Sequence, residues 1–429
     1  MTLERYVVDK KEEIRALKVE HRELHVPDTK RFILAVLGPR RAGKTYFLYD
    51  NILNKKSLRD DDFIFVNFED VALHGATSKD ILKAVNLHAE IYGKEPEFLF
   101  FDEVQVVEGW DSAIFTLFEK KKYSIFLSGS SSKLLSKEIA SKLRGRSLKF
   151  ALLPFSFREF LKVKGIDAIE KPISTKKENM VKNALRRYIQ RGGFPDVVFE
   201  PKIAGSFFRD YVDVVLFRDV VERHGIKNLF VIRFLINAVL SSVSKEFSVH
   251  RAFKALKSQG VKVSKKTLYS YSLLLEDVFF CFFLKRFADS MRSSELSVPK
   301  VYLCDTGMAK TLSGSKDSIG RLMENTVFLE LFRQSNQNPL AELFYWKDSL
   351  GNEVDFVVRE RNRVKQLLQV SFFSERRELK QRETKALLKA SKELKCNNLL
   401  VVTWDYESKE KINGKTITFT PLWKWLLEN

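Results

Sequence analysis

The stretch LGPRRAGKTYFL, residues 37–48, constrains the fold of this chain more than any other part of its sequence. The pattern G-x-x-x-x-G-K-[ST] is matched at every position, by Gly38, Gly43, Lys44 and Thr45. The preceding run RFILAVLG (31–38) is typical of a buried parallel strand, and the following YFLYDNILN is typical of a helix. Strand, glycine-rich turn and helix together direct backbone N–H groups and a helix N-terminus at phosphates.

The loop therefore predicts a bound nucleotide and its metal. Lys44 is expected to reach the β- and γ-phosphates, and the Thr45 hydroxyl to hold Mg²⁺. An N-K-x-D guanine-reading motif is absent from the sequence, which favours ATP and ADP as ligands. The candidate nucleotide-binding residues are Gly38, Pro39, Arg40, Arg41, Ala42, Gly43, Lys44, Thr45 and Tyr46. Arg40 and Arg41 face either the phosphates or a neighbouring domain.

A second motif, EFLFFDEVQ (97–105), supplies two carboxylates after an apolar run. A buried strand that ends in Asp-Glu places Asp102 beside the metal ion, and Glu103 where it can polarise an attacking water. A solvated turn is the alternative interpretation. The phosphate loop upstream favours a hydrolytic site.

A third strand, KYSIFLSGSSS (122–132), ends in small polar residues. In ATPases with an extra strand between the two motifs, a polar residue here senses the γ-phosphate. Ser130 is the candidate and Ser128 the reserve, while a serine-rich turn that caps a helix is equally compatible. With DDFIFVNFED (61–70) as a further strand, the sequence predicts a parallel sheet with helices on both faces.

Two arginines follow in SKLRGRSLKF (141–150). Arginine stabilises the charge on a transferring phosphoryl group, in cis or from a neighbouring subunit. Arg144 or Arg146 is therefore a candidate arginine finger or lid sensor, with an exposed surface arginine as the alternative.

The charge balance favours a polyanionic partner. The 429 residues carry 74 Lys+Arg against 55 Asp+Glu, a net charge of +19, which favours nucleic acid or an anionic membrane surface as the partner, with a lysine-rich solvated face as the alternative. Three scattered cysteines argue against a disulfide framework and a structural zinc. The charged N-terminus and the lack of a long apolar run predict a cytoplasmic protein with no membrane segment.

The order of motifs along the chain resembles the archaeal and bacterial AAA-type (AAA+) P-loop ATPases. The motifs that carry the resemblance are LGPRRAGKT, FFDEVQ with Trp110, LSGSSSKLLS, LRGRS, LPFSFREFL, GGFPDVV, FRDVVERHGI, TLYSYSLLLEDVFF, PKVYLCDTGM and GNEVDFVV. The resemblance implies an AAA+ core, a winged-helix region and a C-terminal domain of restriction-endonuclease-like fold. The expected divisions are residues 1–150 for the core with an N-terminal helix, 151–205 for a helical lid and linker, 206–295 for the winged helix, and 296–429 for the α/β nuclease-like domain.

The middle of the chain carries a helix-turn-helix pattern. VHRAFKALKSQG is a short helix ended by Gly260, and VKVSKKTLYSYSLLLED starts a second helix with Ser264 as its N-cap. The residues near the start of that second helix are candidates for DNA contact: Lys265, Lys266, Thr267, Tyr269 and Ser270. A purely structural role, or one in binding protein, is the alternative.

The C-terminal part carries the remains of a nuclease motif. The restriction-endonuclease fold needs a carboxylate on a helix, an Asp on one strand and Glu-x-Lys on the next, which hold Mg²⁺ and activate water. Glu324 and Asp355 fit the first two positions, but the third is Gln369, with Ser371 in place of the lysine. Glu353 either shares the Asp355 site or is exposed. The departure favours a binding or structural domain that is catalytically degraded.

Together these patterns predict a Mg²⁺-dependent ATPase that couples its nucleotide state to DNA binding or remodelling. One alternative is a nucleotide-gated switch or scaffold that binds protein partners without DNA. Another is an ATP-dependent DNA nuclease. An arginine that acts in trans would require a homo-oligomer.

Overall fold

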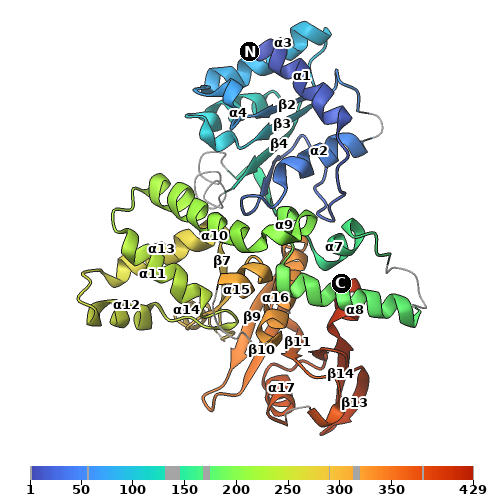
Figure 1. The fold of residues 1–429 in the computed structure, drawn as a ribbon, viewed down its shortest axis with the longest axis vertical. Helices are drawn as coiled ribbons and strands as arrows, with labels where there is room; N and C mark the ends of the chain where they lie inside the picture. Colours follow the sequence, from blue (N-terminus) through green and yellow to red (C-terminus); the bar gives the residue numbers. More distant parts are fainter. Residues whose placement is uncertain are drawn as a thin grey trace. The chain divides into compact units, whose positions relative to one another are not determined.

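A computed structural model shows a chain of two compact units (Figure 1). The first unit contains residues 1–153 together with 277–279, and the second contains 154–276 and 280–429. The structure describes residues 2–55, 58–130, 145–167, 174–288, 290–312, 319–378 and 381–428.

The first unit is built on a five-stranded parallel sheet of order β2-β3-β4-β1-β5. Its strands are β1 (Ile33–Leu37), β2 (Phe63–Asn67), β3 (Phe98–Asp102), β4 (Ser124–Gly129) and β5 (Ser147–Ala151). The predicted parallel sheet is confirmed, and β4 lies between β1 and β3 as expected of an extra strand. Because all neighbours are parallel, the carboxyl ends of β1, β3 and β4 meet at one edge.

Helices cover both faces of this sheet. They are α1 (Leu3–Ala16), α2 (Lys44–Asn54), α3 (Ser78–Tyr92) and α4 (Trp110–Glu119), with short 3₁₀ turns η1 (Val71–Leu73) and η2 (Val104–Val106). The chain moves across the sheet in one direction from β1 to β2 and in the other from β2 through β3 to β4. Since such crossovers are right-handed, α2 lies on one face, and α3 and α4 lie on the other.

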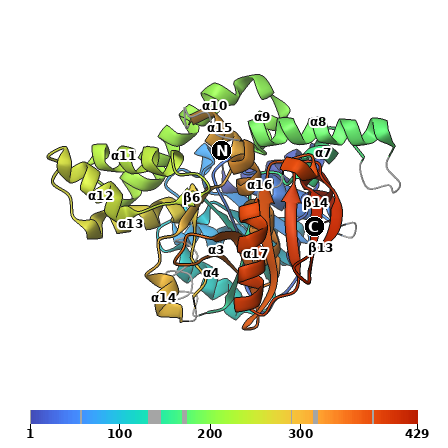
Figure 2. The ribbon, with the colours of Figure 1, turned by 90° about the horizontal axis from the view of Figure 1, so that it is seen from below.

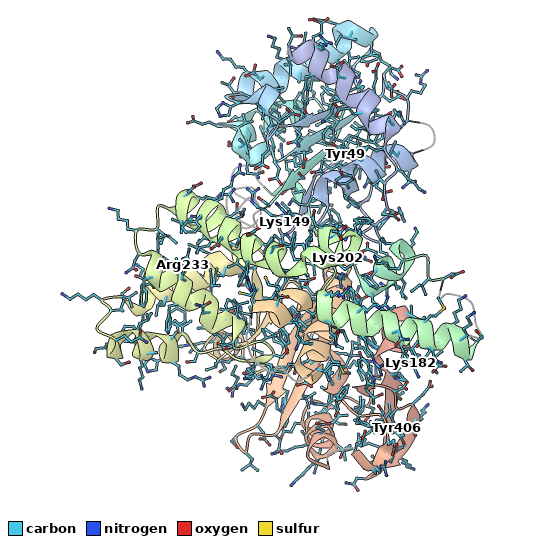
Figure 3. The ribbon with its side chains drawn as sticks, viewed as in Figure 1. Tyr49, Lys149, Lys182, Lys202, Arg233 and Tyr406 are labelled. Atoms are coloured by element: carbon cyan, nitrogen blue, oxygen red, sulfur yellow. The ribbon has the colours of Figure 1, made fainter. Side chains whose placement is uncertain are left out.

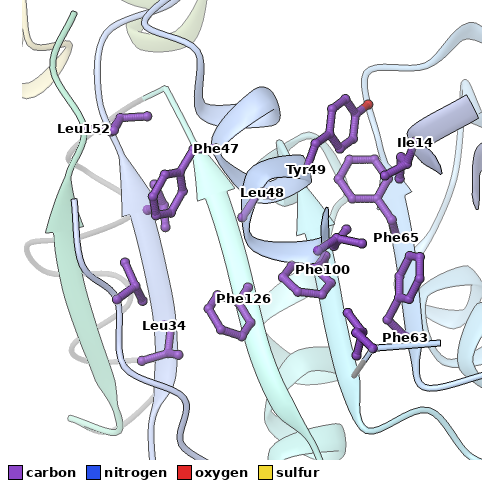
Figure 4. Close-up of a cluster of buried hydrophobic side chains, with 14 residues drawn as sticks. Ile14, Leu34, Phe47, Leu48, Tyr49, Phe63, Phe65, Phe100, Phe126 and Leu152 are labelled. Carbon is purple, nitrogen blue, oxygen red and sulfur yellow. The ribbon is translucent and has the colours of Figure 1, made fainter. Parts of the chain in front are cut away.

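The core beneath α2 is mainly aromatic (Figure 4). Phe63, Phe65, Phe100 and Phe126 project from β2, β3 and β4 toward α2 and Ile14 of α1. The rings of Phe100 and Phe126 stack with centroids 4.8 Å apart. Each such side chain contributes about 1.5–3 kcal/mol when it is fully buried. These phenylalanines thus form a packed aromatic layer between the sheet and α2, the helix that follows the phosphate loop.

The second unit begins with α7 (Phe157–Val163) and α8 (Thr175–Arg191), which pack on the C-terminal elements α15, α16 and α18. The Arg158 guanidinium lies 3.0 Å from Glu330, and Lys182 of α8 lies 2.7 Å from Asp405 (Figure 3). The sequence predicts a lid and linker over 151–205. The structure instead includes α7 and α8 in the second unit, because their apolar faces are buried against its C-terminal helices.

A long helical segment follows. It comprises α9 (Pro195–Phe199), η3 (Pro201–Ile203), α10 (Ala204–Val214) and η4 (Val215–Glu222). The second half of this segment, η4, is π-helical. Gly225, with a positive φ of 58°, follows its end.

Helices and a small antiparallel sheet come next in the chain, and Figure 2 labels the helices α11, α12, α13 and α14. The elements are α11 (Leu229–Leu240), β6 (Lys245–Glu246), α12 (Val249–Ser258), α13 (Lys265–Asp277), β7 (Cys281–Leu284), α14 (Met291–Glu295) and β8 (Lys300–Leu303). The strand order is β6-β8-β7. The sequence assigned residues 296–429 to one C-terminal domain. The structure differs, because β8 pairs with β6 and β7 and not with the later strands.

The C-terminal part is a mixed six-stranded sheet of order β13-β14-β12-β11-β10-β9. Helix α17 packs on β10 and β11, and α16 packs on β9 and β11. The elements are α15 (Thr306–Leu312), α16 (Ile319–Gln337), β9 (Ala341–Lys347), β10 (Glu353–Glu360), β11 (Arg363–Ser371), η5 (Arg376–Glu378), α17 (Gln381–Glu393), β12 (Leu399–Thr403), β13 (Ser408–Ile412), β14 (Lys415–Pro421) and α18 (Leu422–Glu428). Strands β10 and β11 pair as an antiparallel hairpin.

The three cysteines are free and buried. Within the described ranges, no helix is both long and apolar enough to cross a membrane.

Candidate functional site

The phosphate loop joins β1 to α2 at the edge where the strands of the first unit end. Gly43 is the N-cap of α2 and has φ 91°, a conformation that favours glycine. Gly38 is required for a different reason: a Cβ there would lie 1.9 Å from the carbonyl oxygen of Leu152. The two glycines of the motif thus serve a left-handed turn and a close approach of two backbones.

Lys44 is buried inside the loop. Its Nζ lies 3.3 Å from the Gly38 carbonyl and 3.2 Å from that of Pro39, to which it donates hydrogen bonds. The same ammonium lies 3.4 Å from Oε1 of Glu103. The loop lysine and the second acid of the strand motif are therefore direct neighbours.

Asp102 ends β3 and is fully buried. The Thr45 hydroxyl donates to its Oδ2 at 2.7 Å, and the Ser128 hydroxyl donates to its Oδ1. Burial, and then the neighbouring Glu103 carboxylate, raise the pKa of Asp102 to about 6. A hydroxyl beside a carboxylate is a set of hard oxygen donors, which fits Mg²⁺.

Glu103 follows with a positive φ of 49°, which turns its side chain toward the loop. Its backbone N–H donates to the Ser128 hydroxyl at 3.1 Å, and the Gln105 amide donates to its carboxylate. Burial raises the pKa of Glu103, but Lys44, Gln105 and Arg40 outweigh this, so the pKa lies below its usual value. The carboxylate is thus ionised and held by a fixed partner on each oxygen.

The structure separates the roles of the two serines at the end of β4. Ser128, the reserve candidate, joins Asp102 to the Glu103 backbone. The Ser130 hydroxyl, the first candidate, is buried and has no hydrogen-bond partner among the described residues. Its role as a γ-phosphate sensor remains a prediction.

Of the candidate arginines, Arg144 lies outside the described residues. Arg146 precedes β5, and its carbonyl accepts the N–H of Ile33 at the start of β1, so it lies at the opposite edge of the sheet from the phosphate loop. Its guanidinium pairs with Glu119 and lies 5.3 Å from the ring of Phe115. The structure therefore does not bring Arg146 to the phosphate loop of its own chain.

Within the loop, Arg40 lies 3.4 Å from Glu69, which follows β2. Arg41 has a positive φ of 60°. Tyr46 is exposed on α2, with its ring 5.7 Å from that of Tyr49. Glu69 was not predicted, because it is separated from the loop in sequence.

Arg22 is a further residue that the motifs did not indicate. Its buried guanidinium donates to the carbonyl of Ala42 at 2.9 Å and to that of Leu153 at 2.7 Å. It thereby braces the phosphate loop from the segment before β1. No pattern in the sequence distinguishes it from other arginines.

The helix-turn-helix candidates lie together on α13, as expected. Ser264 caps this helix by accepting from the Thr267 N–H at 3.0 Å. Lys265, Lys266 and Tyr269 are exposed. The Lys265 ammonium lowers the pKa of His250 on α12, which shows that the two helices concentrate positive charge. Further exposed basic residues of α12 and the turn are Arg251, Lys254, Lys257 and Lys262.

The nuclease-motif candidates also meet. Glu324 of α16 and Asp355 of β10 share one partner, the Lys300 ammonium, at 2.9 Å from each. The Gln369 amide donates to Asp355 at 2.6 Å. The sequence indicated that the site lacks its lysine because Ser371 occupies that position. The structure supplies a lysine from β8, which no local motif revealed.

Residues 30–161 match the model of an AAA domain. Residues 182–318 and 319–425 match two domains of unknown function, DUF8612 and DUF4143.

Two relatives match nearly the full length. An uncharacterized protein of Methanocaldococcus jannaschii, MJ1544, is 37% identical over 99% of this chain and 95% of its own. An uncharacterized protein of Haemophilus influenzae is 26% identical over 92% of this chain and 94% of its own. Among solved structures, a Walker-type ATPase of Pyrococcus abyssi is 14% identical, covers 65% of this chain and 90% of that one, and has a TM-score of 0.39.

Proposed function

This chain belongs to the family of MJ1544, with an AAA domain at residues 30–161, and from that premise we propose that it is a Mg²⁺-dependent ATPase. The proposal includes coupling of the nucleotide state to DNA binding by the second unit. The observation that carries it is the joint geometry of Lys44 with Glu103 and of Thr45 with Asp102.

The binding step uses the loop backbone and Lys44. The backbone N–H groups of residues 40–45 and the N-terminus of α2 attract the phosphates, and Lys44 turns to the β- and γ-phosphates. Thr45 and Asp102 hold Mg²⁺, which neutralises charge on the phosphates when bound. Arg40 and Tyr46 extend this surface.

The hydrolytic step uses Glu103. When Lys44 turns to the phosphates, one oxygen of Glu103 loses its cationic neighbour and becomes available to a water. Gln105 continues to hold the other oxygen, so the carboxylate keeps its orientation. Glu103 then accepts a proton from the water as that water attacks the γ-phosphate. We assign the sensing of that phosphate to Ser130, supported by its buried hydroxyl without a partner.

An arginine acting in trans is part of the proposal. Since Arg146 lies at the far edge of its own sheet, it can serve a nucleotide only from a neighbouring subunit. Arg144 is the second candidate. Either assignment requires a homo-oligomer.

DNA binding is inferred for the region 229–303. The region contains helix α11, strand β6, helices α12 and α13, strand β7, helix α14 and strand β8, with β8 between β6 and β7 in the sheet, and this order supports the proposal of a winged-helix module. The exposed lysines at the start of α13 and along α12 form the candidate phosphate-contacting surface. Lys265 and Lys266 contact phosphates, while Thr267 and Tyr269 meet sugar or bases.

A protein partner is the second candidate for the same helix. Tyr269 and Leu273 lie one turn apart on α13 and are 55% and 59% exposed. Exposed apolar neighbours of this kind favour a protein partner, as in a nucleotide-gated switch. Nuclease activity is the least supported function, since Lys300 already neutralises Glu324 and Asp355.

The test is phosphate release by the wild type and by Glu103→Gln, with and without duplex DNA. We expect Glu103→Gln to lower the rate by about 10²–10⁴-fold while nucleotide is still bound. DNA should change the wild-type rate and bind more weakly as salt rises. Equal rates for both proteins would contradict the ATPase proposal. No retention on DNA at low salt would favour the switch, which binds protein partners without DNA.

A further inference from the structure

The candidate nuclease residues surround a buried ammonium group. Lys300, only 2% exposed, directs Nζ at three carboxylates from two elements. Its distances are 2.9 Å to Oε1 of Glu324, 2.7 Å to Oε1 of Glu353 and 2.9 Å to Oδ1 of Asp355. An ammonium has three N–H donors, so each proton has one carboxylate acceptor.

A β-bulge directs Asp355 into this cluster. Trp346 of β9 pairs with Val354, and Phe344 pairs with Val357, so Asp355 and Phe356 together lie opposite Tyr345. Bulges of this kind re-aim one side chain and are enriched at functional sites. The backbone of Val370 and the amide of Gln369 donate to the second oxygen of Asp355 at 2.9 and 2.6 Å.

The side chains that contact the outer oxygens of these carboxylates are also those expected around a charged cluster. Tyr302 donates to Oε1 of Glu324 at 2.7 Å, and Lys347 lies 3.5 Å from Oε2 of Glu353. Oε1 of Gln369 is buried and has no hydrogen-bond partner in the part of the chain that the structure describes. It is the kind of neutral oxygen that a cation at this place would use.

As they stand, these residues do not fit a metal ion. Three carboxylate oxygens converge at hydrogen-bonding distance, but Nζ of Lys300 occupies the point of convergence. In the described part of the chain, no group of three or more His, Cys, Asp or Glu is arranged to hold a metal ion. Besides Gln369 and Ser371 at the third motif position, the disagreement with a metal-dependent nuclease lies in Lys300, which is contributed by a different sheet.

We propose that Lys300 is a built-in cation that takes the place of a divalent metal ion in this carboxylate site and keeps the C-terminal sheet metal-free. The charge comes from β8, which pairs with β6 and β7, so the lysine also joins the three-stranded sheet to α16 and β10. The acidic residues of the motif are retained because they bind a lysine. Removal of that lysine uncovers a latent site for a divalent cation.

The experiment uses the full-length chain without nucleotide, in an Asp102→Asn background that removes the acid proposed to hold Mg²⁺ in the first unit. Mn²⁺ binding is measured by electron paramagnetic resonance. The melting temperature of each variant is measured with and without Mn²⁺. The test variant is Lys300→Met, which keeps the length of the side chain without its charge. The matched control is Lys347→Met, which removes the lysine on the other side of Glu353.

We expect the background chain and Lys347→Met to bind no Mn²⁺ at this cluster. Lys300→Met should lose about ten degrees in melting temperature, because buried carboxylates lose their partner. Mn²⁺ should bind with a stoichiometry of one and restore most of that loss. Asp355→Asn added to Lys300→Met should abolish the binding.

Three results would overturn the proposal. The first is that the background chain binds Mn²⁺ and that Asp355→Asn abolishes this binding. Lys300→Met could fold and bind none. If Lys300→Met fails to fold, Lys300→Met combined with Glu324→Gln removes one buried charge as well. Failure of this double variant to bind Mn²⁺ through Glu353 and Asp355, or to fold in its presence, would equally contradict the proposal.

Discussion

The Lys44 ammonium lies 3.4 Å from the Glu103 carboxylate, although β1 and β3, which lead to these residues, are separated by β4. The contact is possible because α2 starts above β4 and the left-handed backbone of Glu103 turns its side chain back toward the loop. Glu103 is thus kept ionised beside the Lys44 ammonium, which we propose moves toward the phosphates when nucleotide binds. Its orientation then depends on Gln105.

Gln105→Ala tests that dependence. Loss of the amide hydrogen bond leaves Glu103 less fixed and raises its pKa. We expect kcat to fall by roughly tenfold, the loss of about one charged hydrogen bond, while KM for ATP stays the same. The acid limb of the pH–rate profile should shift to higher pH. An unchanged profile would show that Gln105 does not position the base.

Ser128→Ala and Ser130→Ala form a matched pair on one strand end. Ser128 bonds both Asp102 and the Glu103 backbone, so its removal should cost about 1–3 kcal/mol of unfolding free energy. Ser130 has no partner to lose, and its alanine variant should keep wild-type stability. Urea unfolding measures both values. A rate defect in Ser130→Ala at unchanged stability would support the sensor role, and a normal rate would exclude it.

The pH dependence of stability should report Asp102. Burial raises its pKa to about 6, above its usual value, so the folded chain holds this proton where the unfolded chain has lost it. The contribution of Asp102 to stability is therefore complete below about pH 4 and declines as pH rises to about 6. Asp102→Asn cannot titrate. The melting-temperature difference, variant minus wild type, should increase across this window, and a flat difference would contradict the assignment.

Gly192→Ala should unfold the second unit. A Cβ there would lie 1.9 Å from Oδ1 of Asp305, and the backbone has a positive φ of 81°. Asp305 already accepts from the Gly193 N–H at 2.7 Å and the Gly307 N–H at 2.8 Å, so it cannot move away easily. We expect a loss of more than about 3 kcal/mol by chemical denaturation. Gly205→Ala, in a helix with open space around it, is the control and should gain up to about 1 kcal/mol.

Substitution of Lys265 and Lys266 by alanine tests the DNA surface. Each lysine that neutralises a phosphate contributes about one unit to the slope of log K against log salt, so the slope should fall by about two. The control is Lys409→Ala with Lys411→Ala, on the exposed β13 hairpin, which changes the net charge equally. Equal effects of the two pairs would assign the binding to bulk charge and not to α13.

The sequence by itself determined the parts of the site that are contiguous in the chain. A phosphate loop requires glycines at fixed places in one short turn, and a strand that ends in Asp-Glu sets both acids at a sheet edge. The helix-turn-helix pattern likewise predicted α13 with its Ser264 cap.

Tertiary structure decided the contacts between segments that are distant in the chain. Strand register alone brought Ser128 to Asp102 and placed Arg146 at the far edge of its sheet. Tertiary packing also placed α8 on the C-terminal helices. It likewise brought Lys300 into contact with Glu324 and Asp355. Local patterns encode which face of an element is buried. They do not encode which distant element covers it, because that depends on how all the buried surfaces fit together.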